Sequence, residues 1–344
     1  SQSSNKTKKT WTEINRLMGR KGRGGVETLR RDTHAEVLTD EQAIAEEFGD
    51  FFSSIVRMTN DGNPREVMYN VCGLLKACDS SFKFSEIEEE DVLKLLKVLD
   101  PNKAIGVDKI SGKLLRMTAC GISRSLTSLF NSSLKCGDLP SEWKAALVTP
   151  VPKNGSSDLV GNYRPISVLP VVVKVLERLV HRQLYTYLQE NSLLHPTQFG
   201  FRPGHSTQDV LVNLVDEWRE ALDNDELVGA IFMDLSKAFD MVDHAILLQT
   251  LAKYGVNGAE MRWFLGYLRD RKQRVRVGAA ESEWAEIQRG VPQGSILGPL
   301  LFILYVNDLP QAIRSGNVRQ FADDTTVSVV RADKGDLEQC LVNN

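Results

Sequence analysis

The sequence has little of what marks secreted, zinc-binding or disulfide-stapled proteins. It contains five cysteines in 344 residues, their spacing is irregular, and no CxxC pair occurs. An odd number of irregularly spaced cysteines is typical of reduced intracellular thiols, so we expect neither a disulfide framework nor a zinc site. The five histidines form no HExxH pattern. Any metal ion in this protein should therefore be held by carboxylates.

Long apolar runs are also absent. A membrane-spanning helix needs about 18 or more mostly apolar residues in a row. The nearest candidate, Ile296 to Val306, is shorter and contains Gly298 and Pro299. The N-terminus is polar and basic, without the apolar segment of a signal peptide. We therefore expect an intracellular protein with no membrane partner.

The net charge of −3 argues weakly against a nucleic-acid-binding protein when it is taken alone. The distribution of charge is more informative, because nine Lys or Arg residues and only three acids lie between Ser1 and Asp32. A second basic cluster runs from Arg269 to Arg276. Each cluster could be a solvated surface or a contact for nucleic acid.

The overall composition is that of a folded globular protein, with 42% apolar and 25% charged residues. The length allows one large domain or two ordinary ones. The chain does not begin with Met, and its last residues, Asp336 to Asn344, have the pattern of a helix that is cut short. We expect a fragment of a longer polypeptide.

Apolar spacing and capping residues predict a largely helical first half. A first helix begins at Thr39, where Gln42 completes a capping box, and another follows a capping box of Ser85 and Glu88. A further helix follows Ser206. Its apolar positions fall on one face, which consists of Leu211, Leu214, Val215, Trp218 and Leu222. The remaining expected helices run from Ser111 to about Lys135, from Pro170 to Leu188, from Asp243 to Gly255 and from Leu300 to Val306.

Short apolar or alternating segments predict strands, most of them in the second half. Ala145 to Val151 is one, and Tyr163 to Leu169 is expected to pair with it. Leu227 to Met233 is a nearly continuous apolar run of strand length, so we expect a buried strand. Two hairpins complete the set, one of Gln273–Val277 and Glu283–Ile287 around Gly278, the other from Val318 to Val330.

Three aspartates stand out in this β-rich half. Asp234 ends the predicted buried strand, and Asp323 and Asp324 lie near the tip of the second hairpin. An Asp at a strand end is a common turn residue, although an Asp-Asp pair is unusual at a hairpin tip. If the two strands are neighbours, the three carboxylates converge and repel one another unless cations lie between them. Divalent metal ions with oxygen ligands, and metal-assisted nucleotidyl transfer, would suit that arrangement.

Six segments in the order of a known family surround these aspartates. Together they resemble the motifs of reverse transcriptases. The residues around Asp234 and Gln293 are most similar to those of the non-LTR, LINE-type group, which includes jockey-like and CR1-like elements. The segments are Lys103–Asp108, Asn162–Ser167, Gln198–Thr207, Ala230–Asp240, Arg289–Pro299 and Phe321–Asp324. Any one of them would be a weak signal, but six in order are specific.

The resemblance implies a role for each matched position. Asp234, Asp323 and Asp324 would be catalytic and would hold two Mg²⁺ ions, for which Mn²⁺ could substitute. The residues expected to contact the nucleotide are Lys153, Arg164, Leu235, Phe239, Gln293 and Gly294, and Arg202 and Ser206 are expected to contact the template. Phe239 lies at the family's steric-gate position, where a large ring would collide with a ribose 2′-hydroxyl.

Ordinary structural roles remain open for several of these residues. Phe239 could be a core aromatic, Gly294 a plain turn residue, and Ser206 a simple helix cap. Lys153 and Arg164 could be solvated loop cations.

The implied fold is α+β, a right-hand polymerase with fingers and palm present and the thumb missing. Residues 1–84 would form a basic arm and N-terminal helical extension, 85–225 the fingers with part of the palm, and 226–344 the palm. The implied activity is RNA-directed DNA synthesis from dNTPs on an RNA template with a DNA primer, and the fragment alone should be weak or inactive.

The resemblance further implies a ribonucleoprotein with the element's own RNA, found in the nucleus and the cytoplasm. Two alternatives remain open: a group II intron-type reverse transcriptase, and a catalytically silent polymerase fold that serves as an RNA-binding scaffold.

Overall fold

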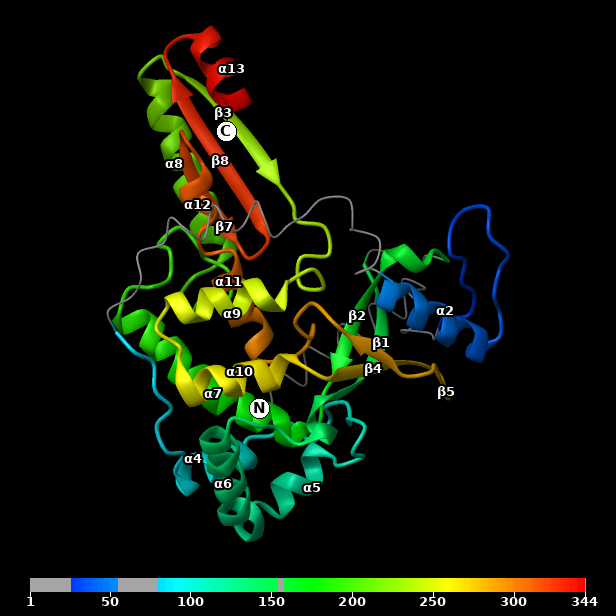
Figure 1. Cartoon of the computed structure of the whole chain (residues 1–344). Coiled ribbons are helices and arrows are strands. Elements are labelled where there is room, and N and C mark those ends of the chain that lie inside the picture. Colours follow the sequence, from blue (N-terminus) through cyan, green and yellow to red (C-terminus); the bar gives the residue numbers. More distant parts are fainter. Residues whose placement is uncertain (1–25, 55–79, 154–157, 344) are drawn as a thin grey trace, which may run out of the picture. The chain divides into compact units, whose positions relative to one another are not determined.

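The computed structural model describes residues 26–54, 80–153 and 158–343, which form two compact units (Figure 1). The first unit contains the described residues up to Phe52, together with those of Val148–Pro165 and Arg274–Trp284. The second contains the other described residues. Most of the predicted basic arm lies outside the described residues. Within the described part of the chain, no helix combines the length and the apolar character needed to cross a membrane.

Helix α2 (Glu41–Ser54) is the main helix of the first unit. Its cap differs from the prediction: Ala43 N donates to Asp40 Oδ2 at 2.9 Å, so Asp40 and not Thr39 begins the helix. The predicted capping box is wrong because Gln42 is engaged elsewhere, donating to Glu46 Oε1 and to Glu281 O. The predicted apolar face is largely confirmed, since α2 buries Ile44, Ala45, Phe48 and Phe52.

A five-stranded sheet has the order β2-β1-β4-β5, with β6 pairing with β4. Its strands are β1 (Ala145–Pro152), β2 (Tyr163–Val168), β4 (Arg271–Val277), β5 (Ala280–Glu281) and β6 (Ala285–Ile287). The predicted pairing of the first two strands is confirmed. The predicted hairpin around Gly278 is confirmed too, but its return strand is in two pieces. Ser282 interrupts it, because its Oγ accepts the Val275 N–H at 2.9 Å in place of a backbone carbonyl.

The second unit contains most of the helices. They are α4 (Glu89–Lys97), α5 (Gly112–Met117), α6 (Ala119–Cys136), α7 (Val171–Glu190), α8 (Thr207–Asp223), α9 (His244–Lys253), α10 (Gly258–Leu268), α11 (Leu297–Tyr305), α12 (Leu309–Ala312) and α13 (Lys334–Asn343). Helix α11 packs on α7 and α9 and is buried along most of its length, as its uniformly apolar sequence predicts. The helix expected from Ser111 to Lys135 is divided at Thr118 into α5 and α6.

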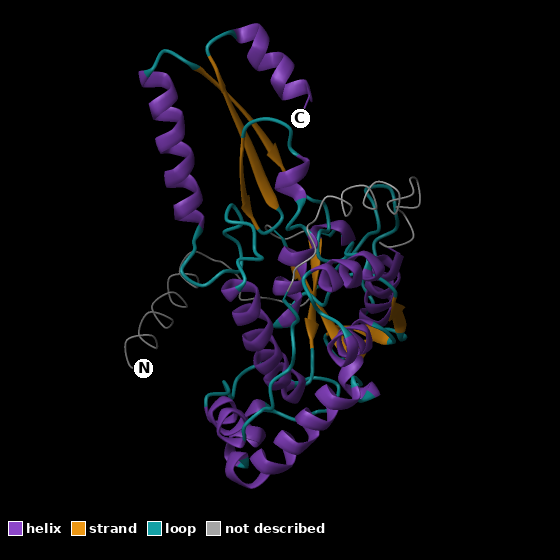
Figure 2. Ribbon diagram, turned by 60° about the vertical axis from the view of Figure 1, so that its left-hand side comes forward, coloured by secondary structure: helices purple, strands orange, loops and turns teal. Residues whose placement is uncertain are grey.

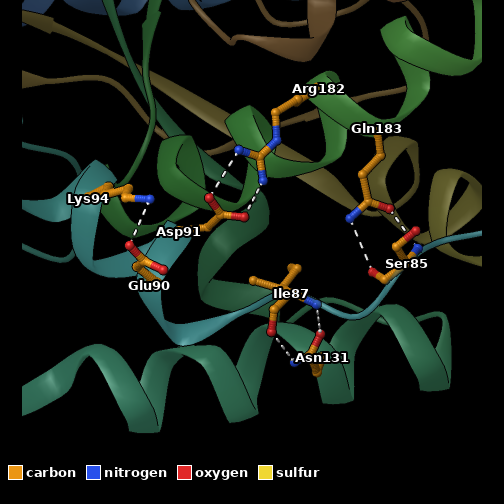
Figure 3. Close-up of polar contacts among 8 residues, drawn as sticks. All are labelled: Ser85, Ile87, Glu90, Asp91, Lys94, Asn131, Arg182 and Gln183. Atoms are coloured by element: carbon orange, nitrogen blue, oxygen red, sulfur yellow. Dashed lines mark hydrogen bonds and ion pairs between the residues drawn. The ribbon is translucent and has the colours of Figure 1, made fainter.

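The start of α4 is fixed by tertiary contacts and not by the predicted capping box (Figure 3). Gln183 of α7 holds the Ser85 backbone from both sides, accepting from its N–H at 2.8 Å and donating to its carbonyl at 3.1 Å. Asn131 of α6 holds Ile87 in the same way. Ser85 therefore caps nothing, because its position is set by neighbouring helices.

A three-stranded antiparallel sheet has the order β3-β8-β7. Its strands are β3 (Leu227–Met233), β7 (Asn317–Phe321) and β8 (Asp324–Arg331). Both the strand and the hairpin were predicted, and so was their pairing. Helices α8 and α13 lie on opposite faces of the sheet (Figure 2). Glu217 of α8 accepts from Ser328 Oγ at 2.8 Å, whereas Leu337 and Leu341 of α13 adjoin Gly229.

The prediction that β3 is a buried strand is wrong, and the apolar face of α8 is largely exposed. Strand β3 is an edge strand, and Phe232 on it is 70% exposed. On α8 only Leu214 and Ala221 are buried, and Leu211, Val215 and Leu222 are exposed. The helix contacts the sheet through Glu217, which turns the expected apolar face toward solvent.

Candidate active site

The three predicted metal-binding aspartates lie at one end of the three-stranded sheet. The last pair between β3 and β8 is Met233 with Thr325, so the register carried one residue further sets Asp234 opposite Asp324. Asp323 lies in the turn that joins β7 to β8, next to Asp324. Residues directly opposite each other in an antiparallel pair point to the same face, so this continued register would set Asp234 and Asp324 on one face of the sheet. Both are exposed, and Asp323 is half-buried.

The donor set at this end of the sheet suits a hard divalent cation. It consists of carboxylate oxygens, which Mg²⁺ prefers. Within the described residues, no group of three or more His, Cys, Asp or Glu side chains is gathered closely enough to hold a metal ion. The three carboxylates lie at one end of the sheet, and the metal role of all three stays a prediction.

The turn that carries Asp323 is held by a residue that sequence reasoning did not single out. Phe321 pairs with Asp324, which leaves a two-residue turn in which Ala322 has φ = +59°. The side chain of the fully buried Gln198 hydrogen-bonds to this turn. Its Oε1 accepts from Ala322 N at 3.0 Å, and its Nε2 donates to Ala322 O at 3.3 Å.

Gln293 is tied to the loop that follows β3. Its Nε2 donates to both carboxylate oxygens of Asp240, at 2.9 and 2.8 Å. A carboxylate only accepts hydrogen bonds, so this contact fixes which end of the Gln293 amide faces Asp240. The Gln293 carbonyl oxygen of the backbone accepts from Ser167 N at 2.6 Å. Gln293 therefore links two of the motif segments, and Asp240 is a second residue that the sequence did not reveal.

Gly294 follows in a conformation that requires glycine. Its φ is +116°, and a Cβ at this position would lie 2.6 Å from Ser167 O. Any side chain would therefore displace the Ser167 strand end. The contact explains the glycine structurally, and its predicted contact with a nucleotide remains untested.

Phe239 is half-buried between other rings. It stacks on Phe302 with centroids 4.7 Å apart and meets Phe201 edge-on at 5.9 Å. The ring therefore has a packing role of its own, which leaves its predicted steric-gate role open. Leu235, directly after Asp234, is 39% exposed.

Arg202 and Ser206 both make structural contacts. Arg202 Nη1 donates to His195 O at 3.1 Å and to Gln198 O at 2.9 Å, so it braces the segment that grips the turn. Ser206 caps α8 in a reciprocal capping box with Asp209. That hydrogen bonding with Ser206 lowers the pKa of Asp209 below its usual range. The predicted template contacts of Arg202 and Ser206 are not tested by this geometry.

Lys153 and Arg164 belong to the first compact unit, whereas the aspartates belong to the second. Both side chains are exposed, and Lys153 Nζ donates to Gly161 O at 3.1 Å. Their predicted triphosphate contacts stay a prediction.

A buried polar contact supports the start of α11, just after Gln293 and Gly294. Glu177 of α7 accepts from Ile296 N and from Tyr267 Oη, each at 2.7 Å. Burial is the main cause that raises the pKa of Glu177. An isolated buried carboxyl on an apolar helix gave no signal in the sequence, because its partners come from α10 and from the loop before α11.

Comparison with known proteins identifies the family. A family model described as reverse transcriptase (RNA-dependent DNA polymerase) matches residues 151–343, more than half of the chain. The chain belongs to the reverse transcriptase family. Every predicted site residue, from Lys153 to Asp324, lies within this reverse transcriptase match, and so do Glu177, Gln198 and Asp240.

Several relatives of this reverse transcriptase chain come from mobile elements of insects. One is the probable RNA-directed DNA polymerase from transposon X-element of Drosophila melanogaster, 32% identical over 260 residues, which are 74% of this chain and 28% of the relative. Another is the RNA-directed DNA polymerase from mobile element jockey of the same species, 33% identical over 255 residues, 72% of this chain and 28% of the relative. These are polymerases of non-LTR retrotransposons, so the predicted resemblance is confirmed.

A third relative is the retrovirus-related Pol polyprotein from type-1 retrotransposable element R2 of Popillia japonica. It is 31% identical over 183 residues, which are 52% of this chain and 25% of the relative. The chain spans less than a third of the length of each of these three relatives.

Proposed function

We propose that this chain is the catalytic part of an RNA-directed DNA polymerase from a non-LTR retrotransposon. It would extend a primer 3′-hydroxyl with dNTPs on an RNA template. The observation that supports the proposal is the register of β3 and β8, which ends at the Met233–Thr325 pair, next to Asp234 and Asp324, in a chain of the reverse transcriptase family.

The proposed architecture is the right-hand polymerase fold. The three-stranded sheet and the helices from α9 to α11 would form the palm within residues 226–344. Residues 85–225 would form the fingers with part of the palm, and residues 1–84 a basic N-terminal extension. We assign none of these residues to a thumb. The mixed helix and sheet content and the family membership support this division.

Asp234, Asp323 and Asp324 would hold two Mg²⁺ ions, for which Mn²⁺ could substitute. Bound there, the metal ions would supply Lewis-acid activation of the 3′-hydroxyl and stabilise the departing pyrophosphate. Asp234 and Asp324 are exposed at the end of the sheet, so both carboxylates are accessible to ligands from solution.

The remaining site residues would position the nucleotide. Gln293 Nε2 donates to the Asp240 carboxylate, so the side-chain oxygen of Gln293 would accept a hydrogen bond from a ligand. Phe239 would exclude a ribose 2′-hydroxyl with a ring that Phe302 holds in place. Lys153 and Arg164 would bind the triphosphate, Leu235 and Gly294 would adjoin the nucleotide, and Arg202 and Ser206 would contact the template backbone.

The proposed partners follow from this activity. They are an RNA template, a DNA primer, dNTPs and the element's own RNA in a ribonucleoprotein, which would be present in the cytoplasm and the nucleus. The names of the relatives favour the non-LTR group over a group II intron enzyme. A silent RNA-binding scaffold would not need its carboxylates, and all three are present.

Primer extension on an RNA template with Mg²⁺ tests the proposal. The protein carries its natural flanking sequence and is compared with Asp323→Ala and with Asp216→Ala, an exposed carboxylate of α8. We expect dNTP-dependent DNA product from the natural sequence and from Asp216→Ala, and none from Asp323→Ala. Template-primer binding without product from any of the three would favour the scaffold.

A further inference from the structure

The segment from Thr197 to Gly200 extends the three-stranded sheet beside the turn that carries Asp323. Gln320 N donates to Thr197 O and Phe199 N donates to Gln320 O, each at 2.8–2.9 Å, so the segment pairs with the outer edge of β7. The pairing is parallel and centred on Gln198 and Gln320. It places Gln198 next to the end of β7, where the turn begins.

From this position the side chain of Gln198 hydrogen-bonds to the two peptide groups on either side of the Ala322 Cα. Its amide both accepts from and donates to Ala322, the residue before Asp323. The same Oε1 also accepts from Gly200 N at 2.8 Å, which fixes the amide orientation. The Gln198 side chain is 0% exposed, so water cannot replace these hydrogen bonds without rearrangement.

Gly200 makes the close approach possible. A Cβ at this residue would lie 2.2 Å from Ala322 N and 2.8 Å from Ala322 Cα. No side chain fits between the two backbones at these distances. Ala322 itself has φ = +59°, a conformation that non-glycine residues adopt at a cost and that surrounding contacts must maintain.

We infer that Gln198 is a positioning residue for Asp323. It fixes the turn by hydrogen-bonding to both the N–H and the carbonyl of Ala322, from the side of β7 that faces away from β8. This inference rests on the proposed metal role of Asp323. Gln198 acts through the backbone. Its loss would leave all three carboxylates present but would free the turn that orients the Asp323 side chain. Every metal-dependent step would then weaken while the fold persists.

The test compares Gln198→Met, which keeps the chain length and removes both polar atoms, with Gln189→Met, an exposed residue at the end of α7. Gly200→Ala perturbs the same contact from the other side, and Gly121→Ala is its control, because a Cβ there meets nothing within 4 Å. The readouts are amide hydrogen exchange across residues 317–325 and Mn²⁺ affinity by electron paramagnetic resonance, with Asp323→Ala as reference.

We expect Gln198→Met and Gly200→Ala to exchange the Ala322 amide faster by about tenfold or more, the scale of losing buried hydrogen bonds. We also expect weaker Mn²⁺ binding in both, and no change in either control. Unchanged exchange in a folded Gln198→Met protein, or faster exchange with wild-type Mn²⁺ affinity, would overturn the positioning role. Should Gln198→Met fail to fold, Gly200→Ala decides by the same two criteria. If Asp323→Ala binds Mn²⁺ as the wild type does, the proposed metal site itself fails, which is a separate result.

Discussion

The helical core and the turn end of the three-stranded sheet are held together in different ways. In the core, α7, α10 and α11 bury apolar side chains such as Leu176, Phe264 and Leu301 completely. At the turn end, Asp234, Asp324 and Phe232 are exposed. Order there comes from hydrogen bonds to a few backbone groups. We therefore expect changes in the core to lower stability, and changes at the turn end to lower activity with little loss of stability.

The largest effect on stability should come from emptying the core. Leu301→Ala removes a fully buried side chain of α11, and we expect a loss of about 2–5 kcal/mol in the free energy of unfolding. Leu211→Ala on the exposed face of α8 is the matched control and should change it by less than about 0.5 kcal/mol. Denaturant unfolding measures both, and equal losses would contradict the described exposure of α8.

Glu177 is the polar exception within the core. Its two carboxyl oxygens satisfy two donors, whereas glutamine has one acceptor oxygen, so Glu177→Gln should lower the free energy of unfolding by about 1–3 kcal/mol. Burial raises the pKa of Glu177, so the folded state keeps a proton that the unfolded state releases above about pH 4.5.

The raised pKa of Glu177 determines how the free energy of unfolding changes with pH. Wild-type stability should fall relative to Glu177→Gln as pH rises from 4.5 through the folded-state pKa. Unfolding curves across this range test the shift. A difference that does not vary with pH would contradict the raised pKa and leave only the lost hydrogen bond.

At the proposed active site, Asp240→Asn should change the orientation of the Gln293 amide without changing the stability of the protein. Asparagine can present its own NH₂ to Gln293 and so allow the Gln293 amide to turn. We expect about a tenfold rise in the KM for dNTP, the scale of one or two lost hydrogen bonds to a charged group, with little change in the unfolding midpoint. Steady-state primer extension with Asp216→Asn as control measures this. An unchanged KM would show that Asp240 does not orient Gln293.

The smallest effect is expected at an exposed ion pair. Arg182 hydrogen-bonds to Asp91 and lowers the pKa of that carboxyl (Figure 3). Arg182→Met should therefore destabilise the protein by at most about 1 kcal/mol. The difference should be present above the usual Asp pKa of 3.8 and disappear as pH falls through the lowered value. A difference that persists in strong acid would indicate lost packing and not lost charge.

The sequence predicted the elements whose stability is local or periodic. Strand β3 is found at the predicted residues, Leu227–Met233, and Asp243 caps α9 as expected. The predicted β7–β8 hairpin also sets Asp323 in its turn. These features depend on apolar alternation, capping chemistry and turn length, all of which can be read within a short segment.

The features that sequence reasoning missed depend on residues far apart in the chain. The predicted Ser85 cap was wrong because Gln183, 98 residues away in the chain, holds the Ser85 backbone. Gln198 and Asp240 lie inside the recognised motifs, but their partners are 124 and 53 residues away. Motif membership was the only available signal for them, and it did not specify which contact each would make.

We propose that Asp234 and the Asp323–Asp324 turn converge on one metal site, and iron-directed cleavage can test this convergence. In that experiment Fe²⁺ replaces Mg²⁺, and hydrogen peroxide oxidises the bound Fe²⁺ to form radicals that cut the nearest backbone. We predict cuts both near Asp234 and within residues 322–325, competed away by Mg²⁺ and lost in Asp323→Ala. Cuts in only one of the two segments, or cuts that persist in Asp323→Ala, would contradict the convergence.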